Sequence, residues 1–94
     1  MEVEVRYYAA LREIAGKRSE RVALPDGSSV RDLVDLLVKR YGEGFGRYIY
    51  DCEGRVRGYL SYMLNGININ SLDGFKTILR DGDILSLLPP IGGG

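Results

Sequence analysis

One amphipathic helix constrains the fold of this chain more than any other stretch. Along residues 30–41, apolar side chains recur at spacings of three and four, so they form a stripe on one face of a helix. The stripe comprises Val30, Leu33, Val34, Leu37 and Tyr41. Ser29 and Asp32 have the spacing of a capping pair at its start, and Gly42 ends it. Such a stripe has to pack against a sheet or another helix.

Alternating and doubly apolar segments predict the strands that this helix covers. The predicted strands are residues 1–8, 21–24, 59–64, 67–69 and 84–88. The first two alternate between apolar and polar side chains and are expected to pair antiparallel. The third and the fifth are apolar on both faces, and Asn65-Gly66 predicts a hairpin turn between the third and the fourth.

Strands joined by short connections, with one main helix, predict a two-layer α+β domain. If the first and last strands are central and parallel, and the helix connects the two halves of the sheet, the arrangement is the β-grasp of ubiquitin. We therefore predict a ubiquitin-like β-grasp domain over residues 1–88, with a mixed sheet of four to five strands packed against one main helix.

The connections between these elements are less regular. Residues 9–15 are helix formers and predict one or two helical turns. Residues 42–58 contain five glycines and predict either a short helical turn near residues 47–51 or a small hairpin through Glu53-Gly54. Arginines alternate with tyrosines in this segment, a composition that can bind nucleic acids, but acidic residues lie among them and favour a solvated loop.

Composition excludes several classes of function. The chain has no histidine and a single cysteine, which excludes His-based catalytic relays, His-containing zinc sites and an internal disulfide. Thirteen basic and thirteen acidic residues balance, so no general field attracts nucleic acid or an anionic membrane. With no apolar run of about 20 residues and no signal peptide, we expect a cytoplasmic protein without membrane or nucleic-acid partners.

The chain ends in a stretch that folding does not explain. Pro89 and Pro90 cannot donate ladder hydrogen bonds, and three glycines follow Ile91. Fully extended, residues 89–94 span about 20 Å, enough to enter the active site of another protein. We predict that they form a flexible, reactive C-terminal tail.

Several segments together resemble the small subunit of molybdopterin synthase (MoaD-type). Residues 5–16 (VRYYAALREIAG) resemble its first strand and turn, and residues 24–33 (LPDGSSVRDL) resemble its entry into the helix. Leu64-Asn65-Gly66 and residues 79–83 (LRDGD) match its later turns, and the Pro-Pro-Ile-Gly-rich ending is similar to its C-terminus.

This resemblance implies a ubiquitin-like sulfur carrier that is not an enzyme on its own. It implies that the carboxylate of Gly94 is adenylated by an E1-like enzyme, which uses ATP and magnesium, and that a sulfur-donor enzyme supplies the thiocarboxylate. The large synthase subunit would take that sulfur to build molybdopterin. Gly92 and Gly93 would let the tail thread into a narrow channel, and the carrier itself would bind no metal or cofactor.

Other roles share the same activation chemistry. The Ile-Gly-Gly-Gly ending is also similar to ThiS, the sulfur carrier of the thiamine pathway. A ubiquitin-like modifier would instead join Gly94 to a lysine by an isopeptide bond. A third alternative is a non-reactive interaction domain with a Gly-rich end.

Strand parity predicts where partners bind. Tyr8 and Leu88 point away from the faces of their strands that carry the core residues, so we expect an outer apolar patch at the root of the tail. Tyr59 and Met63 extend this patch. Residues 89–91 (Pro89, Pro90 and Ile91) complete the predicted partner-binding set. The rival prediction is that these side chains pack beneath residues 42–58.

Overall fold

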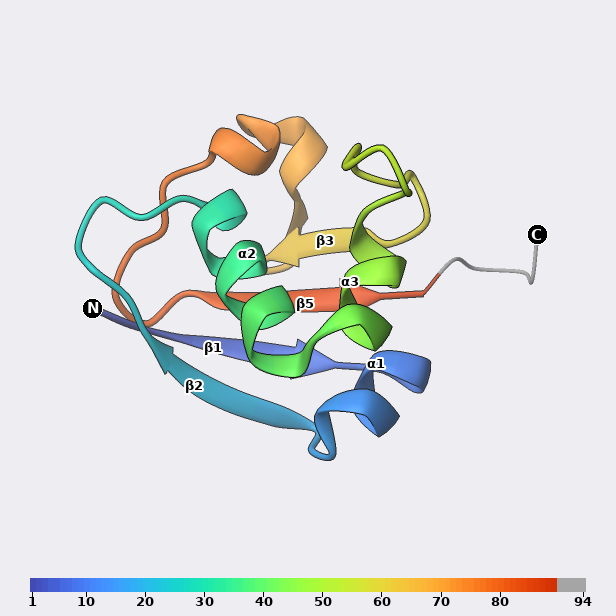
Figure 1. Ribbon diagram of the computed structural model, residues 1–94. Helices are drawn as coiled ribbons and strands as arrows, with labels where there is room; N and C mark the ends of the chain where they lie inside the picture. Colours follow the sequence, from blue (N-terminus) through green and yellow to red (C-terminus); the bar gives the residue numbers. More distant parts are fainter. Residues whose placement is uncertain (90–94) are drawn as a thin grey trace.

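The structure is a computed structural model, and it describes residues 1–89. The helices are α1 (Ala9–Ala15), α2 (Val30–Tyr41) and α3 (Glu43–Ile49), with 3-10 helices at Ile69–Ser71 and Gly74–Lys76. The strands are β1 (Glu2–Tyr7), β2 (Ser19–Ala23), β3 (Ser61–Leu64), β4 (Ile67–Asn68) and β5 (Ile84–Leu88), as Figure 1 shows. Of the predicted tail, Pro89 is described and residues 90–94 lie outside the described residues.

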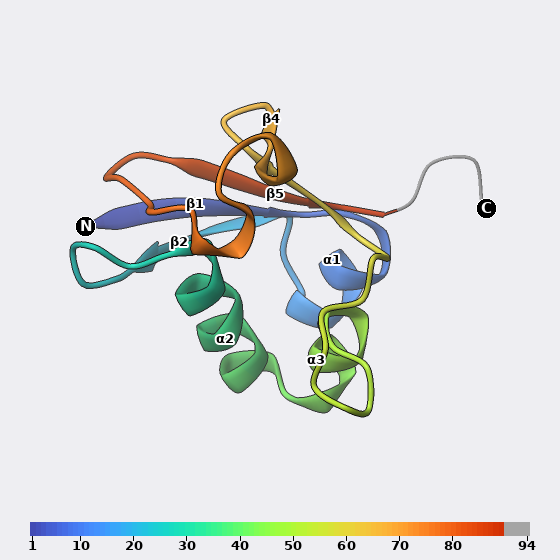
Figure 2. The ribbon, with the colours of Figure 1, turned by 90° about the horizontal axis from the view of Figure 1, so that it is seen from above.

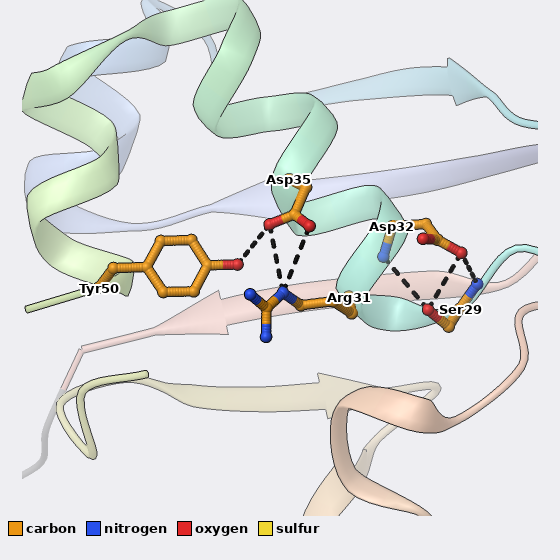
Figure 3. Close-up of polar contacts among 5 residues, drawn as sticks. All are labelled: Ser29, Arg31, Asp32, Asp35 and Tyr50. Atoms are coloured by element: carbon orange, nitrogen blue, oxygen red, sulfur yellow. Dashed lines mark hydrogen bonds and ion pairs between the residues drawn. The ribbon is translucent and has the colours of Figure 1, made fainter. Parts of the chain in front are cut away.

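Helix α2 begins and ends where the sequence predicts. The Ser29 hydroxyl accepts a hydrogen bond from the Asp32 backbone N–H at 3.2 Å, and the Asp32 carboxylate accepts one from the Ser29 N–H at 2.9 Å (Figure 3). This reciprocal pair satisfies two backbone donors that the first turn leaves free. Gly42 follows the last residue with φ +84°, a value that glycine adopts without strain.

The sheet has the predicted β-grasp topology. Its strand order is β2-β1-β5-β3-β4, so the first and last strands lie side by side at the centre. β1 and β5 pair in parallel, with Val5 opposite Leu85, whereas β1–β2, β3–β5 and β3–β4 pair antiparallel. The mixed five-stranded sheet and the helix that connects its two halves form the α+β, ubiquitin-like fold predicted from the sequence.

All three helices lie on one face of the sheet (Figure 2). The core between the two layers is built from the inward residues of the strands and the stripe of α2. On β1 and β5 the inward set is Val3, Val5, Tyr7, Leu85 and Leu87, and on α2 it is Val30, Leu33, Val34 and Leu37. Each of these residues is at most 1% exposed. The alternate side chains of β1 and β5 lie on the opposite face of the sheet.

Residues 42–58 differ from the sequence prediction in one respect. The predicted turn near residues 47–51 is wrong in position, because α3 starts at Glu43 and buries Phe45 and Ile49. Two glycines inside this helix argue against it by propensity. Gly46, however, faces α2, and a Cβ there would lie 3.1 Å from the Val38 methyl carbon Cγ1, so glycine permits the close approach of the two helices.

The hairpin that was the alternative prediction follows α3. Tyr50 and Val56 form an isolated antiparallel bridge, and the Asp51 N–H donates to the Arg55 carbonyl at 2.8 Å. Gly54 turns the chain at φ +79°. The strands also differ from the prediction at their ends. β1 covers Glu2–Tyr7 instead of 1–8, and β2 covers Ser19–Ala23 instead of 21–24. β3 starts at Ser61 instead of residue 59, and β4 stops at Asn68 instead of residue 69.

Candidate functional site

Strand β5 leads into the predicted tail, and its side chains alternate between two faces of the sheet. Leu85 and Leu87 point into the core and are fully buried. Ile84, Ser86 and Leu88 point to the opposite face and stay partly exposed. Pro89 is also half-buried, directly after the last residue of β5. The last strand is therefore anchored by one face and leaves the other available.

A groove on this outer face, which we call the outer-face groove, brings together three of the predicted partner-binding residues. Its lining comprises Arg6, Tyr8, Met63, Asn65, Gly66, Ile84, Ser86 and Leu88. The register explains why: Ser86 of β5 lies opposite both Arg6 of β1 and Met63 of β3. Tyr8, Met63 and Leu88, which are far apart in the sequence, therefore share one surface. The rival prediction, that they pack beneath residues 42–58, does not describe this face, because α3 lies on the other side of the sheet.

Tyr8 is held in place by the start of α1. The chain turns sharply after β1, where Ala9 adopts φ +51°. The Arg12 side chain bridges this turn, since its Nε donates to the Tyr7 carbonyl at 3.3 Å and its guanidinium carbon lies 5.6 Å from the centre of the Tyr8 ring. A cation above an aromatic face is attracted by the ring. Arg12 thus fixes Tyr8 at the rim of the groove.

Tyr59 was predicted to extend the patch of Tyr8 and Leu88, but it lies outside the outer-face groove and lines a neighbouring groove instead. Its ring centre lies 6.1 Å from that of Tyr48 on α3, and half of the residue is exposed. The groove is lined by Gly44, Arg47, Tyr48, Arg57 and Tyr59, and we call it the arginine–tyrosine groove. Ser61, two residues after Tyr59, pairs with Leu88, so this groove flanks the same end of β5.

A partly buried carboxylate on the helix-covered side of the sheet connects three elements. Glu20 of β2 accepts hydrogen bonds from the hydroxyls of Tyr7, at 2.5 Å, and Tyr41 of α2. Its other oxygen accepts from Arg40 at 2.9 Å. Burial, the largest single influence, favours the neutral carboxyl, but the hydrogen bonds from Tyr41 and Tyr7 and the charges of Lys17 and Arg40 together outweigh it and lower the pKa of Glu20.

Sequence reasoning missed this network. Its one available signal is parity: on β2, Glu20 shares a face with Val22, which is buried. A carboxylate at an inward position requires donors that satisfy it. Tyr41 was assigned to the apolar stripe of α2, and its hydroxyl is the donor that the stripe did not reveal.

The described residues hold no arrangement for metal binding or for crossing a membrane. Within residues 1–89, no group of three or more His, Cys, Asp or Glu side chains is placed to hold a metal ion. None of the helices in that range is long and apolar enough to span a bilayer. What the geometry offers is two grooves at the end of a strand that leads into the predicted tail.

Comparisons with known proteins agree with this geometry. The ThiS family model matches residues 5–94. Small archaeal modifier protein 3 of Haloferax volcanii is 37% identical over 94 residues, which is 100% of both chains. The molybdopterin synthase sulfur carrier subunit of Chlamydomonas reinhardtii is 28% identical over 94 residues, again 100% of both.

A solved structure shows the same fold. The crystal structure of SAMP1 from Haloferax volcanii superimposes with a TM-score of 0.85 at 26% identity and covers 100% of each chain. The family match spans nearly the whole chain, and it includes the strands and the helix that place the two grooves. The chain therefore belongs to the ThiS family, among the MoaD- and ThiS-type ubiquitin-like sulfur carriers.

Proposed function

We propose that this protein carries sulfur on its C-terminal Gly94 as a thiocarboxylate and donates it in the biosynthesis of molybdopterin. The observation that supports this best is the family match, which extends to Gly94 and includes the glycine-rich stretch. The full-length similarity to a molybdopterin synthase sulfur carrier subunit favours molybdopterin as the product.

The chemistry takes place at the terminal carboxyl. A carboxylate oxygen of Gly94 attacks the α-phosphorus of ATP, held with magnesium by an E1-like adenylating enzyme, and pyrophosphate leaves. Hydrosulfide delivered by a sulfur-donor enzyme then attacks the acyl carbon, AMP leaves, and the terminal carboxyl becomes a thiocarboxylate. Glycine suits both steps, because no side chain shields the acyl carbon. The chain has no histidine, so proton transfer in these steps falls to the partner enzymes or to carboxylates and water.

The body of the protein positions this carboxyl. The inward residues of β5 anchor the strand, and the outer-face groove docks the large subunit of molybdopterin synthase beside it. Leu88 and Met63 supply apolar contact area in this groove, and Tyr8 supplies an aromatic rim. Once the sheet face is docked, entry of the terminal residues into the partner is an intramolecular step and carries no second cost in translational and rotational entropy.

A second function shares the first step. The 37% identity to a small archaeal modifier protein favours a ubiquitin-like modifier, in which the ε-amine of a lysine on a target protein displaces AMP and forms an isopeptide bond with Gly94. Both functions need the adenylate and differ in the nucleophile that follows.

Intact-mass spectrometry of protein isolated at neutral pH separates the two functions. Exchange of one oxygen for sulfur at Gly94 supports the sulfur carrier, and target lysines that carry the Gly tail support the modifier. Cys52 is the matched control, because this single cysteine is exposed and its thiol could also carry transferable sulfur. Cys52→Ser should keep the sulfur.

Deletion of Gly94 should abolish adenylation by the E1-like enzyme of the same organism. ATP–pyrophosphate exchange measures this step directly. Thermal unfolding should be unchanged, because all of the described core lies within residues 3–87. Adenylation that persists without Gly94 would disprove the proposed mechanism.

A further inference from the structure

The arginine–tyrosine groove has a chemical character that the proposed function does not yet use. Its lining contains two arginines and two tyrosines and no carboxylate. In the sequence, three arginines and two acidic residues lie within residues 47–57. The fold sorts them: Arg55 pairs with Glu53 at 2.7 Å and does not line the groove, whereas Arg47 and Arg57 do.

Arg57 is held in the groove by backbone atoms. Its Nε donates to the Arg47 carbonyl at 2.8 Å and to the Tyr50 carbonyl at 3.1 Å, which satisfies acceptors at the C-terminal end of α3. Within residues 1–89 it forms no ion pair with a carboxylate. The remaining N–H donors of its guanidinium are therefore oriented but unpaired by any acid of the described chain.

Arg47 adds a second positive charge that a partner can recruit. It pairs with Glu43 at 3.6 Å, but the side chains are 78% and 91% exposed. An ion pair this exposed contributes little to stability. A carboxylate from another molecule can therefore take the place of the Glu43 carboxylate beside Arg47 with little loss of free energy.

The groove also lies where a partner has to arrive. The Ser61–Leu88 pair places Tyr59 next to the end of β5. Figure 1 shows α1, α3 and the C-terminal end of β5 at one end of the molecule. A protein that receives residues 90–94 must approach this end, so it passes the exposed Tyr59 ring and the two arginines.

We propose that the arginine–tyrosine groove binds an acidic segment of the protein that receives the tail. This inference rests on the proposed function. Arginine and tyrosine, together with tryptophan, are enriched among the residues that contribute most to binding at protein interfaces. A short acidic segment meets the two arginines of this groove alone, whereas an extended nucleic acid would continue into the adjoining pocket, where Glu43 and Asp51 contribute to the lining.

A titration with a model ligand tests the groove without any partner enzyme. Backbone amide NMR shifts would be followed while a blocked hexaglutamate peptide is added, with hexaglutamine as the uncharged control. Saturable shifts confined to residues near Arg47, Tyr48, Arg57 and Tyr59, and absent with hexaglutamine, support the proposal. Shifts scattered over all basic residues overturn it, as does equal or stronger binding of a thymidine hexanucleotide at the groove.

Variants then connect the groove to the tail. Arg47→Gln keeps the backbone contacts of Arg57, and Arg55→Gln on the same loop is the matched control. With the E1-like enzyme, Arg47→Gln and Tyr59→Ala should each raise the half-saturating carrier concentration about threefold, with the maximal rate unchanged. The double variant Arg47→Gln/Arg57→Gln should raise it about tenfold. Near 1 M salt, where the screening length is about 3 Å, the effect of the arginines should disappear.

The two proposals fail in different ways. Unchanged half-saturation in all groove variants, with normal adenylation of the parent protein, overturns the groove and leaves the tail chemistry standing. Absence of adenylation in the parent protein overturns the proposed function, while the peptide titration still decides on the groove. An equal effect of Arg55→Gln would show a general charge effect and would also overturn the groove.

Discussion

At the scale of single residues, Glu20 has the most demanding environment in the described chain. Its carboxylate accepts hydrogen bonds from two tyrosine hydroxyls and from one arginine, and these bonds connect β2 to β1 and α2. Tyr7 is fully buried, and burial together with the bond to Glu20 raises its pKa. The tyrosine therefore stays a neutral donor, and the carboxylate stays ionised, so each group reinforces the state of the other.

Truncation of Glu20 should destabilise the fold. Glu20→Ala leaves the Tyr7 hydroxyl buried without an acceptor, and we expect a loss of about 2 kcal/mol in the free energy of unfolding. For a domain of this size that lowers Tm by roughly 10 °C. Glu13→Ala, on the exposed side of α1, is the control and should change stability by less than about 0.5 kcal/mol. Chemical denaturation measures both, and equal stability of the two variants would show that the network is dispensable.

The same network predicts that the free energy of unfolding decreases at acidic pH. Since the pKa of Glu20 is lowered by folding, its ionised form contributes stability above its unfolded pKa, near 4.3. That contribution is lost as the pH falls through the lower folded value. The difference in the free energy of unfolding between the parent and Glu20→Gln should therefore decrease as the pH falls from about 4.3 through the folded pKa of Glu20.

At the scale of elements, alternate residues of β5 serve different purposes: one set packs in the core and the other lines the outer-face groove. Leu87 is fully buried, whereas its neighbour Leu88 lines the outer-face groove. Leu87→Ala should cost about 3 kcal/mol of stability, because it opens a cavity in the core. Leu88→Ala should cost less than about 1 kcal/mol but weaken binding to the large synthase subunit. Calorimetry of binding and thermal melts would check both, and a stability loss at Leu88 as large as that at Leu87 would place Leu88 in the core.

Elements with a strong local signal were predicted from the sequence, and elements that depend on tertiary packing were not. Helix α2 was predicted because Ser29 and Asp32 cap it and its stripe is continuous. Helix α3 was misplaced because Gly46 lowers helix propensity while serving the contact with Val38. Parity correctly placed Tyr8, Met63 and Leu88 on one outer surface. It could not place Tyr59 in its groove or reveal Glu20, since both depend on which helix covers that part of the sheet.

At the scale of the whole molecule, several tyrosine side chains are fully or partly shielded from water. Four of the seven tyrosines have a pKa raised above the ordinary value of 10, mainly by burial: Tyr7, Tyr41, Tyr50 and Tyr62. For Tyr50, burial and the hydrogen bond to Asp35 raise the pKa to about 12. That bond, with Arg31 between the two elements, fastens residues 50–58 to α2 (Figure 3).

Alkaline titration should therefore reveal the folded state. The stabilisation by the neutral Tyr50 phenol is complete below its unfolded pKa, near 10, and is lost as the pH rises through about 12. Ultraviolet absorbance of tyrosinate should rise in stages, and Tyr50→Phe should remove the stage near pH 12. A single transition near pH 10 in the folded protein, with all seven tyrosines ionised, would contradict this description of the core.

The strand order also determines when this protein can fold during its synthesis. Of the described strands, β5 is made after the other four, yet it joins β1 to β3 at the centre of the sheet. Before β5 leaves the ribosome, the nascent chain has two separate strand pairs, β1–β2 and β3–β4, which are marginal alone. We therefore expect a chain interrupted before β5 to remain unfolded, because it lacks the strand that joins the two pairs.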